Sequence, residues 1–367
     1  MTASQVIKYL GSKRALAPAL GVIASESGAG EAVDLFTGTT RVAQEFKRRG
    51  LEVVANDIAS YSKVLADCYI ATDADEVDGQ QLRAALDSLQ RLPGKRGYFT
   101  RTFCEESRYF MEKNGMRVDA IRDAIEERYS DSWMRPILLT SLMLAADRVD
   151  STTGVQMAYL KQWAPRASND LELRMPVLLP GAGRAERRDA TALAAQLPKT
   201  RLMYLDPPYN QHRYFTNYHI WETLIRWDAP EAYGVARKRA DAREASTKSV
   251  YNSRREMPAE MRRLLGAINA ELAVVSYNNE SWIPPEDMMA ALRDAGFEDV
   301  RLLSFDHRRY VGAQIGIHNP SGEKVGRVSH LRNVEYLFLA GPADQVDACA
   351  AAVGRGDARG GLASTPP

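Results

Sequence analysis

The chain has 367 residues, of which 45% are hydrophobic and 26% are charged, a composition typical of a globular protein with one large or two modest domains. The formal net charge is +1, which excludes a uniformly basic nucleic-acid-binding protein. Any binding of a polyanion has to come from local basic patches.

Cysteine and histidine usage argues against a metal site. Cys68, Cys104 and Cys349 lie far apart, and no CxxC or Cys/His cluster occurs. The sparse, odd cysteine count favours a reducing compartment. The N-terminal stretch MTASQVIKYLGSKRALAP lacks the apolar core of a signal peptide, and no apolar run is long enough to span a membrane. We therefore expect a cytoplasmic protein with no metal and no membrane partner.

The first part of the chain predicts a strand, a turn, a helix and a second strand. Residues 32–36 predict the first strand, 41–49 have helical spacing and end at Gly50, and 51–55 predict the second strand. This order is a βαβ unit of the doubly wound α/β class.

The texture changes between residues 60 and 180, where the sequence is charged, aromatic and mainly helical. Residues 118–128 and 135–149 have the spacing of amphipathic helices, and the second is apolar enough to be buried. The last residues, 341–367, are rich in Ala, Gly and Asp, and we expect a flexible tail without chemistry there.

Further strands are predicted at 201–205, 273–277, 300–305 and 334–339. We expect one α/β sheet, built from 1–60 and 181–340, with a mostly helical domain inserted at 61–180.

The residues DLFTGTT (34–40) follow a predicted strand and open a helix. Gly38 permits a tight turn where backbone can approach a ligand. Asp57 ends the next strand about 20 residues later, where an acid accepts hydrogen bonds from ribose hydroxyls. The loop has no GK[ST] and is not a full GxGxxG, since Thr40 stands where a second glycine would help. An adenosine ligand without a pyrophosphate is therefore favoured. S-adenosylmethionine is such a ligand; the alternative is a plain strand-turn-helix with a capping threonine.

The sequence MYLDPPYNQHRYFTNYH (203–219) leaves an apolar strand through Asp206, Pro207, Pro208 and Tyr209. Ligands of open α/β sheets bind at the carboxyl ends of strands. Two prolines fix the backbone and remove two N–H donors, so the turn offers acceptors, the Asp206 carboxylate and the Pro207 carbonyl. These suit an exocyclic amine, and Tyr209 adds an aromatic face for a planar base.

An amine on a planar ring, held beside a methyl sulfonium, predicts methyl transfer to a base nitrogen. Such a reaction depends mostly on in-line positioning and on electrostatic stabilisation of the amine as it becomes positive. The alternative for the tetrapeptide is a rigid surface turn.

The order of these blocks resembles the D12-class DNA adenine-N6 methyltransferases, and most of all the modification methylases of restriction systems. DLFTGT is followed by DPPY across a helical insertion, and the N-terminal block KYLGSK (8–13) is present. DPPYNQHRYFTNYHIWE (206–222) and RVDSTTGVQMAYLKQW (148–163) match extended forms of the family. The resemblance covers about residues 6–340. It implies a Rossmann-like, S-adenosylmethionine-dependent methyltransferase sheet whose helical insertion recognises the target.

The resemblance also implies roles for individual residues. Phe36 and Gly38 match the loop under the methionine part of the cofactor, Asp57 matches the ribose acid, and Asp189 matches the acid that holds the adenine. Tyr9, Lys13, Asp34 and Asp206 complete the expected cofactor positions. Asp206, Pro207, Pro208 and Tyr209 match the catalytic tetrapeptide. Thr40 departs from the commoner glycine, which puts the tilt of the cofactor loop in doubt.

Some of these residues have structural alternatives. Lys13 at the start of a helix can be a solvated charge, Asp189 can be the cap of a helix at 191–197, and Phe36 can be a core residue.

An enzyme that acts on a base nitrogen in duplex DNA has to flip the base out of the stack, and it needs a basic surface. Residues 237–263 hold nine Lys/Arg and four acids, and STKSVYNSRRE in this window mixes hydroxyls with basic side chains. A second basic stretch is DHRRYVG (306–312). The residues that we expect to contact DNA are Lys248, Arg254, Arg255, Arg308 and Arg309. A solvated pair of charged helices is the alternative.

We expect a site-specific DNA adenine-N6 methyltransferase, solitary or paired with a restriction endonuclease that acts separately on the same site. It would work as a monomer on double-stranded DNA, in the cytoplasm and at the nucleoid when bound. A second hypothesis is a methyltransferase of RNA adenine or a protein amide, although those usually begin the tetrapeptide with Asn. A third is a non-catalytic DNA-binding relative, against which the intact Gly38, Asp57 and DPPY argue.

Overall fold

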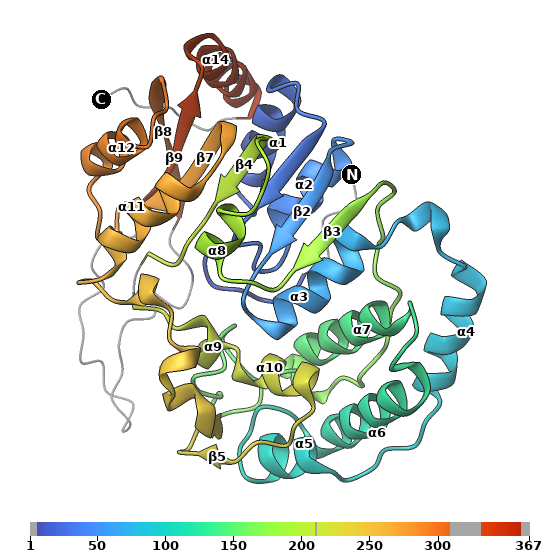
Figure 1. Cartoon of the computed structure of the whole chain (residues 1–367). Coiled ribbons are helices and arrows are strands. Elements are labelled where there is room, and N and C mark those ends of the chain that lie inside the picture. Colours follow the sequence, from blue (N-terminus) through green and yellow to red (C-terminus); the bar gives the residue numbers. More distant parts are fainter. Residues whose placement is uncertain (1–5, 210, 309–331, 361–367) are drawn as a thin grey trace. The chain divides into compact units, whose positions relative to one another are not determined.

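The computed structural model describes residues 6–209, 211–308 and 332–360 (Figure 1). The strands of the main sheet are β1 (Glu31–Asp34), β2 (Glu52–Asn56), β3 (Gly183–Glu186), β4 (Thr200–Leu205), β7 (Ala270–Asn278), β8 (Asp299–Arg308) and β9 (Arg332–Gly341). The helices are α1 (Ala17–Glu26), α2 (Arg41–Arg48), α3 (Ser60–Ala66), α4 (Gly79–Gln90), α5 (Tyr98–Thr100), α6 (Glu112–Tyr129), α7 (Arg135–Arg148), α8 (Ala190–Ala194), α9 (Tyr214–Asn217), α10 (His219–Arg226), α11 (Met257–Ala267), α12 (Pro285–Asp294) and α14 (Ala343–Gly360).

The seven strands form one sheet in the order β3-β2-β1-β4-β7-β9-β8. The pairs β2–β3, β1–β4 and β4–β7 are parallel, whereas β9 runs antiparallel to both β7 and β8. This arrangement confirms the predicted doubly wound α/β class. None of the helices in the described ranges is long and apolar enough to cross a membrane.

Contacts within the chain define two compact units. The first unit comprises Met1–Lys13, Phe36–Ala190 and His212–Ser249. The second comprises Arg14–Leu35, Thr191–Gln211 and Val250–Pro367. The helical segment 61–180 therefore packs with sequence on both sides of it, and its role in recognising a target stays a prediction.

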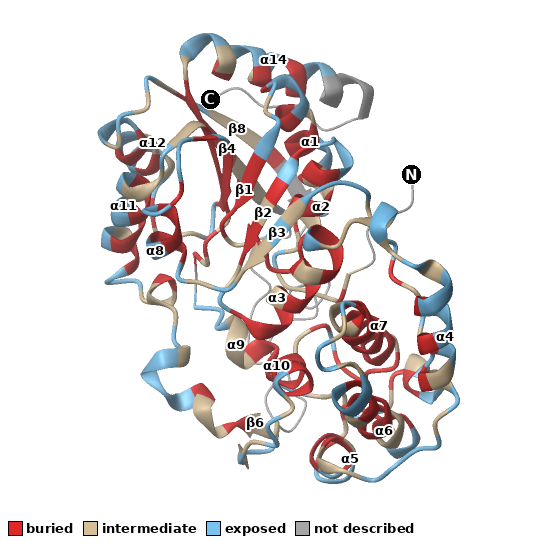
Figure 2. Cartoon of the chain, turned by 45° about the vertical axis from the view of Figure 1, so that its right-hand side comes forward, coloured by how far each residue is buried: buried red, intermediate tan, exposed pale blue. Residues whose placement is uncertain are grey.

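The core of the first unit contains α6 and α7, which pack against each other. Figure 2 shows α7 buried along most of its length, as predicted, because its apolar residues cover the whole circumference of the helix. Helix α6 begins six residues before the predicted helix at 118–128. Asn114 and Gly115 in its first turns are poor helix formers, but Asn114 accepts a hydrogen bond from the Leu171 backbone and Gly115 leaves room for Cys104.

The end of the chain corrects one prediction. Residues 343–360 form α14, where we expected a flexible tail. The buried side chains of Val346, Cys349 and Val353 follow helical spacing, and α14 packs against α1. Alanine is the best helix former, so the composition that suggested a loose tail favours a helix once that face is buried. Residues 361–367 lie outside the described part of the chain.

Strand β3 was missed by the sequence analysis. It is only four residues long, reads Gly-Arg-Ala-Glu and has no fully buried residue. Its register is set by parallel pairing with β2, from Val53↔Gly183 to Asn56↔Glu186. A short edge strand of this kind carries no apolar run or alternation from which it could be predicted.

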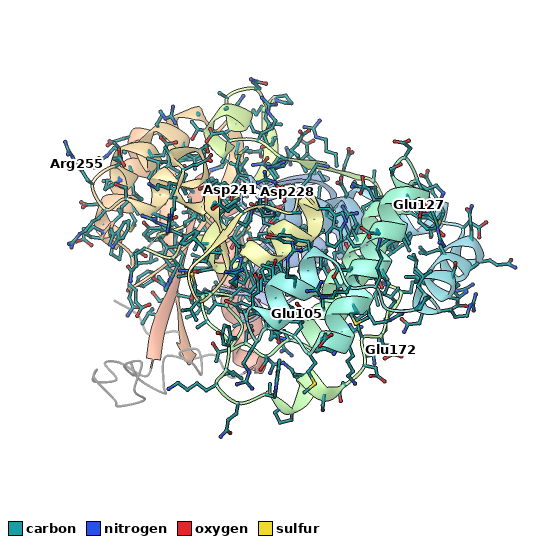
Figure 3. The ribbon with its side chains drawn as sticks, turned by 90° about the horizontal axis from the view of Figure 1, so that it is seen from below. Glu105, Glu127, Glu172, Asp228, Asp241 and Arg255 are labelled. Atoms are coloured by element: carbon teal, nitrogen blue, oxygen red, sulfur yellow. The ribbon has the colours of Figure 1, made fainter. Side chains whose placement is uncertain are left out.

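A small hairpin, β5 (Ala232–Tyr233) with β6 (Lys238–Arg239), is fixed by a buried arginine. Arg239 is 1% exposed and forms paired hydrogen bonds with Asp228, at 2.7 and 2.6 Å, and with Asp241, at 3.0 and 2.8 Å. Figure 3 labels these two acids, which lie beside each other. A member of the basic run at 237–263 is thus structural.

We predict that Arg239→Ala lowers the free energy of unfolding by about 3 kcal/mol, because it breaks a buried ion pair. The loss should not be larger, since Asp228 and Asp241 are partly exposed and keep part of their hydration. Urea unfolding measures the loss. The control is Arg243→Ala, which removes an exposed arginine 3.7 Å above the Tyr233 ring and should cost about 0.5–1 kcal/mol. Equal losses in the two variants would contradict a structural role specific to Arg239.

Candidate functional site

The Gly38 turn has a left-handed backbone, which glycine adopts most easily because it has no Cβ. Gly38 has φ +50°, and a Cβ there would lie 3.3 Å from Cε1 of Tyr9. Thr40 takes φ +62°, in the left-handed region that glycine favours. Its buried hydroxyl donates to the Thr39 carbonyl at 2.6 Å and accepts from Gln44 Nε2 at 2.9 Å. These bonds hold the turn in a glycine-like shape, and the effect of Thr40 on a bound cofactor stays a prediction.

Asp57 forms hydrogen bonds with both the Gly38 turn and the start of α3. Its Oδ2 accepts a hydrogen bond from the Gly38 N–H at 2.9 Å, and its Oδ1 accepts one from the Ala59 N–H at 3.0 Å. A carboxylate has about four acceptor sites, so Asp57 can still accept a hydrogen bond from a ligand hydroxyl. Exclusion of water raises the pKa of Asp57, an effect that hydrogen bonds from the backbone N–H groups of Ala59, Gly38 and Ile58 partly offset.

The two acids predicted to hold the nucleoside part of a cofactor follow neighbouring parallel strands. Asp57 follows β2, and its backbone N–H donates to the Glu186 carbonyl of β3 at 3.3 Å. Asn56 exchanges two side-chain hydrogen bonds with the backbone of Arg188, at 3.1 and 3.0 Å, which fixes the segment just before Asp189. Asp189 is exposed and directly precedes α8, so its roles as ligand or helix cap both stay predictions.

Ile58 was missed by the sequence analysis. Its side chain is 65% exposed, although it stands directly after Asp57 at the carboxyl end of β2. The Ile58 carbonyl accepts a hydrogen bond from Arg187 Nε at 3.0 Å. An exposed apolar side chain at this edge is suited to pack on a planar ring, and the only signal in the sequence was its position after the acid.

Tyr9 belongs to an aromatic cluster that the sequence analysis found only in part. Its ring stacks on Tyr218, with centroids 4.6 Å apart, and on Tyr214, at 5.2 Å. Its hydroxyl lies 3.4 Å from that of Tyr61. The Tyr218 hydroxyl also accepts a hydrogen bond from the Leu10 N–H at 2.6 Å. The four-residue spacing of Tyr214 and Tyr218, within the extended motif, was the available signal.

The other predicted cofactor residues have mixed environments. Lys13 is 7% exposed, which excludes the alternative of a solvated lysine. Phe36 is partly exposed, so it is not simply a core residue. Asp34 is buried in β1, in register with Tyr204 of β4. Cofactor contacts of all three stay predictions.

The DPPY turn leaves the carboxyl end of β4 in the second unit. Asp206 and Pro208 are partly exposed, whereas Pro207 is buried. Tyr209 is 7% exposed; its ring meets Tyr277 edge-on, at 5.1 Å between centroids. The Tyr209 hydroxyl accepts a hydrogen bond from Asn278 Nδ2 at 3.3 Å.

Asn278 was not identified from the sequence, although it stands at the end of a predicted strand. Its Oδ1 accepts the Glu280 N–H at 2.9 Å, which fixes the side chain in a turn. Since β4 and β7 are parallel neighbours, with Leu205 opposite Val275, both turns lie at the same edge of the sheet.

The predicted DNA-contacting residues are only partly described. Lys248, Arg254 and Arg255 are exposed and form no ion pair with another described residue; Arg255 extends outward in Figure 3. Arg237, by contrast, pairs with Glu106, and Arg263 pairs with Glu260. For Arg308 the structure describes only the backbone, at the end of β8, and Arg309 lies outside the described residues.

No group of three or more His, Cys, Asp or Glu side chains among the described residues could hold a metal ion.

Comparison with known proteins identifies the family. The D12 class N6 adenine-specific DNA methyltransferase family matches residues 9–291. Modification methylase StsI of Streptococcus sanguinis is 30% identical over 323 residues, which cover 83% of this chain and 49% of that protein. Type II methyltransferase M.NlaIII of Neisseria lactamica is 30% identical over 287 residues, which cover 76% of this chain and 83% of that protein.

Type II methyltransferase M.FokI of Planomicrobium okeanokoites is 27% identical over 326 residues, which cover 83% of this chain and 50% of that protein. The chain therefore spans about half the length of StsI and M.FokI and most of M.NlaIII. The turns after β1, β2 and β4 lie within the matched residues, and the chain belongs to the family of D12 class N6 adenine-specific DNA methyltransferases.

Proposed function

We propose that this chain transfers a methyl group from S-adenosylmethionine to N6 of adenine at a specific site in double-stranded DNA. The observation that carries the proposal is the Asp206-Pro207-Pro208-Tyr209 turn at the carboxyl end of β4, in a chain of this family. The enzyme would be a modification methylase, as the names of the relatives suggest, and it would act alone or beside a separate restriction endonuclease. It would act as a monomer in the cytoplasm.

The residues around Asp57 fit S-adenosylmethionine. The carboxylate has spare lone pairs for the two ribose hydroxyls, and the exposed Ile58 side chain suits one face of the adenine. The Gly38 turn brings backbone close to Tyr9 without a side chain between them, which suits the methionine part. Asp189 would bind the adenine edge. When bound, the cofactor supplies an electrophilic methyl group on its sulfonium.

The DPPY turn would hold the target amine. The Asp206 carboxylate and the Pro207 carbonyl would accept hydrogen bonds from the two N–H groups of adenine N6. With both hydrogens held in this way, the nitrogen lone pair would point out of the ring plane and toward the methyl donor. Positive charge that develops on the nitrogen is stabilised by Asp206, and the methylated amine then loses a proton to this carboxylate or to water.

Duplex DNA has to present the adenine outside the stack, so we propose base flipping as part of the reaction. Because Tyr209 is nearly buried, a flipped base can stack on it only after the groups that cover the ring move. Asn278 would keep the Tyr209 ring in place by donating a hydrogen bond to the Tyr209 hydroxyl. The segment 61–180 would contribute to target recognition, and Lys248, Arg254 and Arg255 would contact phosphates.

We predict that Asp206→Ala lowers methyl transfer to duplex DNA by at least about 100-fold, since it removes both an acceptor for the amine and the stabilising charge. The fold and most of the cofactor affinity should remain. Transfer of radiolabelled methyl to DNA measures the loss, and Glu271→Ala, which removes an acid on β7 paired with Arg201 at 3.0 Å, is the control. Full activity of Asp206→Ala would exclude the proposed catalytic site.

We predict that the double variant Arg254→Ala/Arg255→Ala weakens DNA binding on all sequences alike. If each arginine contacts one phosphate, the plot of the logarithm of the DNA-binding constant against the logarithm of the salt concentration should become less steep by about 2. Fluorescence anisotropy over a range of salt concentrations measures it. The control is Arg48→Ala/Arg49→Ala, which also removes two adjacent arginines. Both of these arginines pair with Glu45, so we do not expect them to contact DNA. An unchanged slope in the first variant would remove this loop from the DNA interface.

A further inference from the structure

Glu222 is a buried acid within the extended motif DPPYNQHRYFTNYHIWE, and the reaction proposed above does not use it. Glu222 is 1% exposed. Oε2 accepts a hydrogen bond from the Ser60 N–H at 3.0 Å, whereas Oε1 accepts none and no basic side chain pairs with the carboxylate among the described residues. Burial of a carboxylate without a cation is costly, which makes a purely space-filling role a poor explanation.

The helix that carries Glu222 is held at both ends, so the position of its carboxylate is fixed. At the N-terminal end of α10 the Ile220 N–H donates to Gln156 Oε1 at 2.8 Å. At the C-terminal end the buried guanidinium of Arg122 donates to the Leu224 and Ile225 carbonyls, at 2.9 and 3.0 Å. Helix α10 also packs on α3.

Asp57 and Glu222 each accept a hydrogen bond from one of the two backbone N–H groups at the start of α3. Asp57 Oδ1 accepts the Ala59 N–H, and Glu222 Oε2 accepts the next one, from Ser60. Ala59 has no side chain that can cap the helix, and the Ser60 hydroxyl forms no hydrogen bond with another described residue. The backbone that orients Asp57 is therefore held by a side chain from α10, far away in the sequence.

We infer that Glu222 is a positioning residue of the cofactor site: it holds the first turn of α3 so that Asp57 is oriented to accept hydrogen bonds from the cofactor ribose. This inference rests on the proposed function, because it takes Asp57 as the ribose acid. It assigns to the extended part of the motif, downstream of the tetrapeptide, a role in binding the cofactor. The stacking of Tyr214 and Tyr218 on Tyr9 is a second link of this kind.

The first test is the affinity for S-adenosylmethionine, measured by calorimetry on the full chain. Glu222→Ala should weaken binding about tenfold, the effect of losing one hydrogen bond that fixes the site. Glu222→Gln keeps an acceptor for the Ser60 N–H and should stay within about threefold of the wild type. Asp119→Ala is the control, because Asp119 is also a buried acid that accepts backbone N–H groups of a helix, from Phe99 at 3.0 Å and Thr100 at 2.8 Å in α5.

The pH dependence separates positioning from a general loss of stability. Burial is the main cause of the raised pKa of Asp57, and the charge of the neighbouring Glu222 raises it further. Tyr9 and Tyr61 are neutral at pH 7, because burial raises the pKa of each well above its ordinary value. Ribose binding needs the Asp57 carboxylate, so affinity falls as pH drops through the pKa of Asp57. Glu222→Gln removes a like charge, lowers that pKa and should move the midpoint to lower pH.

A double-mutant cycle tests the atoms involved. Ser60→Pro removes the N–H that Glu222 accepts, and proline suits this first helical position because the preceding Ala59 is extended, at φ −77° and ψ 137°. Each single variant, Ser60→Pro and Glu222→Ala, should weaken binding, and the double variant should be no weaker than Glu222→Ala.

Wild-type affinity for Glu222→Ala would overturn the inference, as would equal weakening by Glu222→Gln and Glu222→Ala with an unchanged pH midpoint. Additive losses in the cycle would also overturn it. If the folded wild type does not bind S-adenosylmethionine, it is the proposed function that fails.

Discussion

The Asp57 carboxylate is the constraint on which the proposed cofactor site depends. It accepts one N–H from the Gly38 turn and one from the start of α3, so a single side chain fixes two backbone segments on either side of β2. The cost is a carboxylate in a poorly hydrated place, which its raised pKa reflects. A ligand with two hydroxyl donors relieves this cost, and a fixed acid with spare lone pairs is what such a ligand needs.

Distant parts of the chain meet around this acid. Residues 8–13 contribute Tyr9, α3 contributes Tyr61, and the segment after the tetrapeptide contributes Tyr214, Tyr218 and Glu222. Segments that lie far apart in the sequence thus form one connected set of contacts within the first unit. In the second unit, the DPPY turn has its own support in Asn278 and Tyr277 from the neighbouring strand.

Much of the fold was predictable from the sequence, because apolar strands and α7 have strong patterns. The strands at 201–205 and 273–277 are confirmed within longer strands, β4 and β7. Strand β3 and helix α14 were not predictable from local patterns: pairing with β2 defines the first, and packing against α1 stabilises the second. In the site, Gly38, Asp57 and Asp206 have recognisable spacing, whereas Asn278 and Glu222 act through contacts across the fold that one sequence does not reveal.

Single-molecule sequencing of DNA from a methylation-free host that expresses this chain tests the central claim most directly. Our account predicts N6-methyladenine at one enriched sequence motif, and its absence when Asp206 is replaced by alanine. Unmodified adenine throughout, with folded protein that binds S-adenosylmethionine, would contradict the assignment to DNA and point to an RNA or protein substrate.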